Sequence, residues 1–274
     1  MAALDILIPT RNRPAALAVT LATLICQDWR DFDLVIADQS DAGPAWRDPC
    51  VTAVLRVLAA RGHGLTLRSN LPRRGLAQQR QFLLDAATAS EVLYLDDDVI
   101  LEPDVIGRMH RALAGAGCGL IACALIGLSQ RAERRPHQQA VEFWDGPVRP
   151  ETIEPGGPHW PRHLLHNAAN LWHVQNDLAI LPATQKLYKI AWAGGCVLYR
   201  RAALEAAGAF GFWRALPAAH CGEDVLAQLR VMARAGGAGL MPSGAFHQEL
   251  PTTVTERQVD APFWLRPHGH CRVA

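Results

Sequence analysis

The feature that most constrains this chain is an apolar run that ends in three consecutive carboxylates. Residues 92–95 have the pattern of a buried strand, and Asp96, Asp97 and Asp98 follow it directly. Three like charges at this spacing repel one another, and burial penalises each of them. The arrangement therefore favours a bound positive charge, and a hard divalent cation with oxygen ligands is the first candidate. Because such a cation keeps phosphates in its shell, the run predicts a metal-bridged phosphate site at the carboxyl end of a strand.

The same acids have a second interpretation. An Asp at a strand end often begins a turn or caps the next helix, and we expect a helix to begin near Pro103. One or two of the three acids can serve in this way. Three in a row after an apolar strand exceed what a cap needs, so the metal and phosphate site is the favoured interpretation.

Apolar runs alternate with helical patterns over the first half of the chain. Such strands, separated by amphipathic helices, predict an α/β fold with a mostly parallel sheet covered on both faces. Since parallel strands end at a shared edge, Asp38, which ends the second run, should lie near the acid cluster. The chain has no GxGxxG and no GxxxxGK[ST] motif, which argues against a Rossmann dinucleotide site and a P-loop. The expected strands are residues 4–8, 34–37, 65–67 and 92–95, with helices beginning at Pro14, Pro44 and Gly75.

The regular pattern breaks between residues 129 and 189. This stretch holds three tryptophans and five histidines among several prolines and glycines, and it is too long for an ordinary loop. It is either a variable surface excursion with a local aromatic cluster or a wall that binds a sugar acceptor, and the residues do not decide between the two. Regularity returns at residues 191–199, and a further helix is expected to open near Glu223.

Composition bounds the class of protein. Half of the 274 residues are hydrophobic, enough for the core of one large α/β domain, and a formal net charge of +1 gives no support for nucleic-acid binding. The seven cysteines contain no CxxC and suit reduced thiols in a cytosolic protein. We expect no signal peptide, since the first residues carry no basic leader, and no transmembrane segment, since no apolar run approaches about 20 residues.

Taken in their order along the chain, these segments resemble the family-2 glycosyltransferases of the GT-A fold. The resemblance spans about residues 4–250, and the joint order of its parts makes it specific although each part alone is weak. Its parts are residues 6–13 (ILIPTRNR), Asp38, residues 75–80 (GLAQQR), the DXD-type motif at residues 95–98 (LDDD), residues 194–201 (GGCVLYRR) and the ED motif at residues 222–225 (GEDV).

The resemblance implies one GT-A domain over residues 1–250. It comprises a nucleotide-binding half at about 1–126, an insertion at about 129–189, and a smaller acceptor-side half at about 190–250, followed by a tail at 251–274. The implied reaction is inverting transfer of a sugar from a nucleotide-diphospho-sugar donor to a hydroxyl of a carbohydrate or lipid-linked acceptor, in polysaccharide or glycoconjugate synthesis. Mg²⁺ or Mn²⁺ is the implied cofactor. The expected location is the cytoplasm, with peripheral contact to the inner face of the membrane left open.

The resemblance also implies which residues hold the cation and the donor. Asp98 would ligate the metal, and His247 lies where some GT-A enzymes have a third ligand, although His268 and His270 compete for that role. Arg80 would face the diphosphate or orient the acids, unless it is a solvated helix residue. In this resemblance the loop of Thr10 and Arg11 would pack on the nucleoside, Asp38 would accept from an N–H of the base, and Asp96 and Asp97 would hold the ribose or support the metal shell. The full implied set of nucleotide-binding residues is Pro9, Thr10, Arg11, Arg13, Asp38, Arg80, Asp96 and Asp97.

An inverting displacement also needs a base on the acceptor side. Asp224 matches that role, and the start of a helix favours its ionised form. The same position fits a helix cap, and the residues alone leave this open. The resemblance favours the base, with Glu223 orienting the acceptor and with Trp192, Gly194 and Gly195 on the acceptor side.

Two other functions use similar residues. A sugar nucleotidyltransferase would also need a metal and acids, but it normally has a glycine- and lysine-rich phosphate loop, and residues 10–13 contain neither residue type. A binding protein that keeps the fold without turnover is the other alternative. The presence of both Asp98 and Asp224 argues against it.

Overall fold

The alternation predicted for the first half of the chain is confirmed. The computed structural model describes residues 2–254 and 257–266. The elements of the first half are β1 (Leu4–Thr10), α1 (Pro14–Ile25), β2 (Phe32–Asp38), α2 (Pro49–Ala60), β3 (Leu65–Ser69), α3 (Leu76–Ala86), β4 (Glu91–Leu95), β5 (Val99–Leu101), α4 (Val105–Ala116) and β6 (Leu120–Ala122). Those of the second half are α5 (Asn170–Asp177), β7 (Lys186–Tyr188), β8 (Cys196–Arg200), α6 (Arg201–Ala206), α7 (Glu223–Ala235), β9 (Gly237–Met241), β10 (Ala245–His247) and α8 (Ala261–Trp264).

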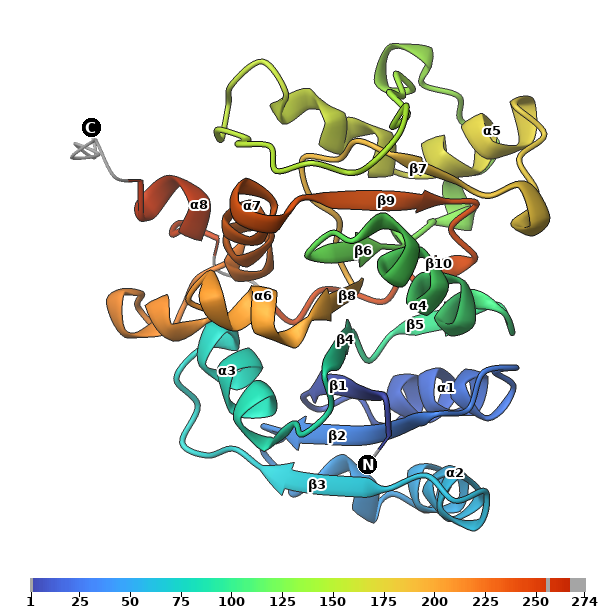
Figure 1. Cartoon of the computed structure of the whole chain (residues 1–274). Coiled ribbons are helices and arrows are strands. Elements are labelled where there is room, and N and C mark those ends of the chain that lie inside the picture. The colour runs from blue at the N-terminus through green and yellow to red at the C-terminus, as the bar shows by residue number, and fades with distance from the viewer. Residues whose placement is uncertain (1, 255–256, 267–274) are drawn as a thin grey trace.

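Eight strands form the central sheet in the order β3-β2-β1-β4-β8-β6-β9-β7 (Figure 1). The pairs from β3 through β4 are all parallel, as predicted, and β6 pairs with β9 in parallel. β8 runs antiparallel to both of its neighbours, and β7 is an antiparallel edge strand. The fold is therefore mixed α/β with a large, mostly parallel sheet.

The direction of β8 matters for the site. In an antiparallel pair the start of one strand lies beside the end of its neighbour. The register pairs Cys196 with Leu95, so Gly194 and Gly195 lie next to the acids that follow β4. The main-chain N–H of Asp96 donates to the carbonyl oxygen of Gly195 at 2.9 Å.

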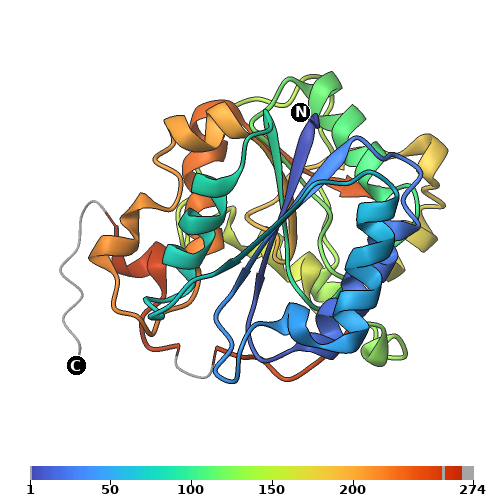
Figure 2. The same cartoon turned by 90° about the horizontal axis from the view of Figure 1, so that it is seen from below.

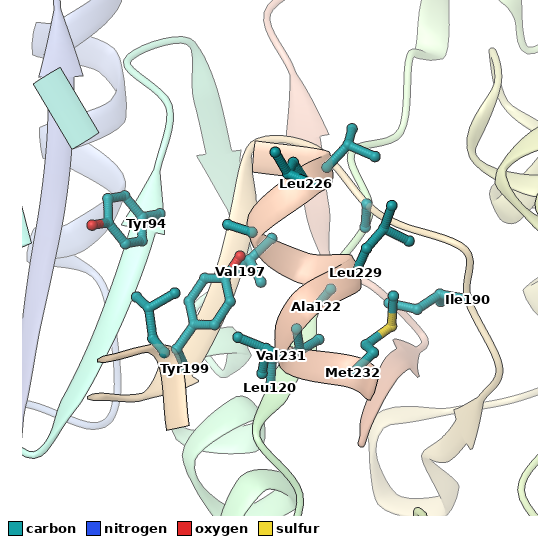
Figure 3. Packing of buried hydrophobic residues seen from close by; sticks show 14 of the residues in the cluster. Tyr94, Leu120, Ala122, Ile190, Val197, Tyr199, Leu226, Leu229, Val231 and Met232 are labelled. Atoms are coloured by element: carbon teal, nitrogen blue, oxygen red, sulfur yellow. The ribbon is translucent and has the colours of Figure 1, made fainter. Parts of the chain in front are cut away.

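Helices cover both faces of the sheet, as Figure 2 shows. Helices α1, α2 and α4 pack on one face, while α3, α6 and α7 pack on the other. Successive residues of each strand supply the two cores in turn, so that Ile6 and Ile8 belong to one core and Leu7 to the other. Burial on both faces explains why the strands are continuous apolar runs. In Figure 3, α7, which carries Leu226, Leu229 and Met232, lies over residues of β6 and β8, and all of these residues belong to one core.

The insertion is joined to the sheet. Residues 129–189 form short 3₁₀ turns, α5 and β7, and they lie at the β7 edge of the molecule (Figure 1). Because β7 pairs with β9, the insertion extends the central sheet instead of lying on it as a separate excursion. Across the described residues, no helix is long and apolar enough to cross a membrane.

One predicted helix begins later than expected. Pro44 precedes a 3₁₀ turn at Ala45–Arg47, and α2 starts only at Pro49. The Asp48 carboxylate accepts a hydrogen bond from the N–H of Cys50 at 2.8 Å, which caps the helix. A proline is well suited to the first helical position after such a cap, and this local signal defines the start.

Candidate active site

A cavity of about 730 Å³ lies at the carboxyl ends of β1 and β4, where an α/β sheet is expected to bind its ligand. Its lining comes from segments far apart in the sequence. They include the loop after β1 (Pro9, Thr10, Arg11, Arg13), the three acids (Asp96, Asp97, Asp98), the start of α3 (Gly75, Leu76, Gln79), the loop before α7 (Ala218, Ala219, His220), and His247 with residues of the strap that follows it (Leu250, Thr252, Thr253, Val254, Arg257).

The three acids have different partners. The hydroxyl of Thr10 donates to Asp97 at 2.6 Å, and Nη1 of Arg13 donates to Asp98 Oδ2 at 2.7 Å. Asp96 is about one-third exposed and accepts from Arg80 at 3.2 Å. Burial raises the pKa of the Asp97 carboxyl to about 7, against the opposing hydrogen bond from Thr10. All three acids therefore lie within ion-pair distance of a guanidinium group, and Asp97, which is 3.6 Å from Nη1 of Arg13, also accepts the hydroxyl of Thr10.

Arg80 is a buried residue, which excludes its interpretation as a solvated helix residue. On α3, Ala77, Arg80 and Leu84 repeat at helical spacing and share the buried face. Arg80 donates through Nε to Glu223 at 2.9 Å and through Nη2 to Asp96 at 3.2 Å. The guanidinium thus joins the acid cluster to the start of α7.

Asp224 lies at the same junction, as the second residue of α7. Gly222 holds the N-cap position in a left-handed conformation, and no side chain caps this end of the helix, so Asp224 is not the N-cap. Burial, reinforced by the charge of Glu223, raises the pKa of Asp224 to about 7. A carboxyl with such a pKa exchanges protons near neutral pH, which suits a general base.

Gly194 and Gly195 were both predicted on the acceptor side, and the structure gives them different surroundings. Gly195 has φ +77° and lies beside Asp96, with Leu125 packed against its Cα. A Cβ at this position would come within 2.3 Å of Leu125. Gly194 has open space around its Cα and an ordinary φ. Trp192 packs nearby, with its ring stacked on His163 at a centroid distance of 5.5 Å.

This difference allows a matched test. Gly195→Ala is expected to lower the free energy of unfolding by about 1–3 kcal/mol, because a side chain at positive φ is strained and the added methyl overpacks Leu125. Gly194→Ala, one residue away, should leave stability within about 0.5 kcal/mol. Chemical denaturation of both variants measures the effect, and equal stabilities would contradict this assignment for Gly195.

Asp38 ends β2 on the predicted edge. Its two carboxylate oxygens accept the backbone N–H groups of Ser40 and Ala45, so the side chain shapes the loop that follows the strand. Asp38 does not line the cavity, whereas its neighbour Gln39 does and is 5% exposed. The predicted contact between Asp38 and the base of a nucleotide stays a prediction.

His247 is brought to the acids because β10 pairs with β5, which follows the cluster. Its Nε2 lies 3.5 Å from Asp98 Oδ2, and its Nδ1 accepts the N–H of Glu249 at 2.7 Å. With Nδ1 as an acceptor, Nε2 carries the ring proton and faces Asp98. Ligation of a cation through Nε2 would therefore require the ring to give up the Glu249 contact. His268 and His270 lie outside the described residues.

Sequence reasoning missed two residues of the site. His220 lines the cavity, and its Nε2 accepts the N–H of Ala77 at 3.1 Å while Nδ1 faces the carbonyl of Pro217 at 2.7 Å. It thus ties the start of α3 to the loop before α7. Thr20 of α1 donates to the carbonyl of Asp97 at 2.9 Å and fixes the turn of the acids. Neither residue carries a local sequence signal.

Over the described ranges, no three His, Cys, Asp or Glu side chains form a ready metal site. For Mg²⁺ at phosphates, one or two carboxylates suffice because the substrate completes the shell. Asp98 fits that role, since it lines the cavity and its Oδ2 accepts from the cationic Arg13.

Comparisons with known proteins agree with this geometry. The model of the family described as "Glycosyl transferase family 2" matches residues 5–206. No curated protein matches the chain significantly. Among solved structures, S. aureus TarS 1-349 has a TM-score of 0.58 at 14% identity over 89% of this chain and 60% of that one.

Two further structures were solved with ligands. TarS 1-349 in complex with UDP-GlcNAc has a TM-score of 0.57 at 13% identity, over 92% of this chain and 60% of that chain. The mannosyltransferase PcManGT from Pyrobaculum calidifontis, in complex with GDP-Man and Mn²⁺, has a TM-score of 0.51 at 16% identity. The match covers 87% of this chain and 56% of that chain. At these identities the likeness shows the GT-A fold, and the chain spans about three fifths of the length of these neighbours.

Proposed function

Because the chain belongs to glycosyl transferase family 2 and is a glycosyltransferase, we propose that it moves a sugar from a nucleotide-diphospho-sugar to an acceptor hydroxyl with inversion at the anomeric carbon. The acceptor we propose is a carbohydrate or lipid-linked glycan. The single observation that carries the proposal is the Arg80 bridge, which holds the donor-side Asp96 and the acceptor-side Glu223 at one junction. This bridge supports the proposal that the donor site and the candidate base lie at one junction.

The residues divide the chemistry between them. Asp224 accepts the proton of the acceptor hydroxyl as that oxygen forms its bond to the anomeric carbon and the bond to the leaving phosphate breaks. Glu223, the neighbour of Asp224 in α7, is held by its ion pair with Arg80 and orients the acceptor. The leaving nucleoside diphosphate gains negative charge, and the arginines of the cavity, Arg11 and Arg13 among them, line the space that receives it.

A divalent cation is part of the proposal. Asp98 would hold it, Asp96 would support its shell, and His247 would join after its ring releases Glu249. When bound, the cation neutralises charge on the diphosphate leaving group. Support comes from the orientation of Asp98 into the cavity and from PcManGT, which was solved with Mn²⁺. One neighbour was solved with a UDP sugar and another with a GDP sugar, so the proposal does not specify the nucleobase of the donor.

The metal assignment predicts a specific loss of affinity. Asp98→Ala should abolish the part of UDP or GDP affinity that depends on Mn²⁺, because it removes the carboxylate that faces the cavity. Calorimetric titrations with Mn²⁺ and with EDTA measure that part. Asp177→Asn, at an exposed ion pair with Arg134, is the control and should behave as wild type. If EDTA leaves wild-type affinity unchanged, the chain binds nucleotides without a cation and the assignment is wrong.

A further inference from the structure

Arg13 is the second arginine that contacts the acid cluster, and its partners differ from those of Arg80. It is the residue before α1, and its side chain turns into the cavity with 15% of its surface exposed. Nη1 lies 2.7 Å from Asp98 Oδ2 and 3.6 Å from Asp97 Oδ1. Nη2 donates to the carbonyl oxygen of Pro251 in the strap beyond β10. The guanidinium is therefore held by two sides of the cavity.

The contact falls on the atom that a cation would need. Asp98 Oδ2 accepts from Arg13, and the same oxygen faces His247 Nε2 at 3.5 Å. A hard divalent cation binds carboxylate oxygens at about 2.0–2.6 Å. A guanidinium nitrogen at 2.7 Å from the same oxygen would lie within a few ångströms of that cation. Two positive charges at such a separation in a partly buried site repel strongly.

The other arginine of the cluster does not share this position. Arg80 pairs with Asp96 and Glu223, and it contacts neither Asp97 nor Asp98 by hydrogen bond. Arg13 alone, among the described residues, forms ion pairs with Asp97, and only Arg13 and His247 lie within ion-pair distance of Asp98. Asp97 and Asp98 thus have a counter-charge of their own, separate from Arg80.

We propose that Arg13 is a built-in counter-ion that competes with the divalent cation for Asp98 and moves to the donor's diphosphate when the cation binds. This rests on the proposed function, because it assumes the cation at Asp98. Arg13 lines the same cavity, and a guanidinium suits phosphate oxygens as well as carboxylates. Metal and nucleotide binding are then coupled, since the nucleotide stabilises the displaced guanidinium and the metal must displace it.

The test is direct Mn²⁺ binding, measured by electron paramagnetic resonance of the free ion, with and without UDP or GDP. Without nucleotide, Arg13→Gln should bind Mn²⁺ about tenfold tighter than wild type, because the competitor is gone. Arg13→Lys keeps the charge and should stay near wild type. Arg134→Gln removes an exposed arginine outside the cavity, whose partner is Asp177, and it should leave Mn²⁺ binding unchanged. The gain in Mn²⁺ affinity caused by nucleotide should shrink in Arg13→Gln.

A measurement on the wild-type protein removes any dependence on the folding of a variant. The Nε–H resonance of Arg13, assigned by its loss in Arg13→Lys, should shift on titration with diamagnetic Mg²⁺ and shift again when nucleotide is added. If wild type binds Mn²⁺ and Arg13→Gln binds it no tighter, or if Mg²⁺ leaves the resonance in place, Arg13 does not compete and the inference is wrong. If wild type binds no Mn²⁺ with or without nucleotide, the metal dependence fails, and the inference with it.

Discussion

Replacing Asp224 by Asn is expected to lower the rate of sugar transfer by about 10²–10⁴-fold, the usual contribution of a general base. Asn keeps the size of the side chain but cannot take the acceptor proton. The N-cap position belongs to Gly222, so the exchange removes no capping side chain. Donor affinity should survive, because Asp224 is not among the residues proposed to hold the cation.

The comparison needs transfer rate, donor binding and melting temperature on the same preparation. Asp85→Asn is the matched control, since it makes the same change on α3, where the exposed carboxylate accepts a hydrogen bond from Gln81. Normal turnover in a stable Asp224→Asn protein would eliminate Asp224 as the base. Early melting with joint loss of binding and rate would show a structural role instead.

The raised pKa of Asp224 also predicts a pH dependence. Burial, together with the charge of Glu223, raises the pKa of this carboxyl from 3.8 to about 7. Since the base acts when ionised, kcat should rise as pH increases through about 7. The stability of the fold should change in the opposite direction, because a raised pKa means that the folded state holds the proton more tightly than the unfolded state. The contribution of Asp224 to the free energy of unfolding is fully present below pH 3.8 and is lost as pH rises through about 7. Asp224→Asn should therefore be more stable than wild type above pH 7, measured by melting at both ends of the range.

Local patterns explain which parts of the site could be predicted. The acid cluster could be predicted because a buried strand and three like charges are adjacent in the sequence. The early strands and helices could be predicted from the spacing of their hydrophobic residues. The direction of β8 has no such signal, since it depends on the route that residues 129–189 take before the strand enters the sheet. The antiparallel direction of β8 places Gly195 beside Asp96. From the order of the segments along the chain we could predict that both residues belong to one site, but not that they are in contact.

Long-range pairing explains what the sequence left open. Arg80 and Glu223 were both predicted in the site, but they are 143 residues apart, so the sequence could not predict that they form an ion pair between α3 and α7. His220 is hidden for the same reason, because its partner is the backbone of Ala77. Asp38 could not be assigned for another reason, because an acid at the end of a strand can either contact a ligand or stabilise a turn. In the structure, both carboxylate oxygens of Asp38 accept hydrogen bonds from backbone N–H groups of the turn.

Arg80 carries the largest expected effect on stability. Arg80→Met should lower the free energy of unfolding by about 3–5 kcal/mol, the usual result of removing one partner from a buried ion pair. Arg80 is 5% exposed and Glu223 3% exposed, so the remaining carboxylate could not be hydrated without opening the junction. Arg134→Met, at an exposed pair with Asp177, should leave the melting temperature nearly unchanged.

The double variant Arg80→Met/Glu223→Met separates charge from packing. If the penalty of the single variant comes from an uncompensated carboxylate, removing that carboxylate as well should recover most of the lost stability, since buried ion pairs exchanged for apolar residues are often neutral. Denaturant unfolding of wild type, both singles and the double completes the cycle. A double variant as unstable as the sum of the singles would show that Arg80 stabilises α3 by packing, independently of Glu223. In that case the bridge between the two halves of the site would have no energetic basis.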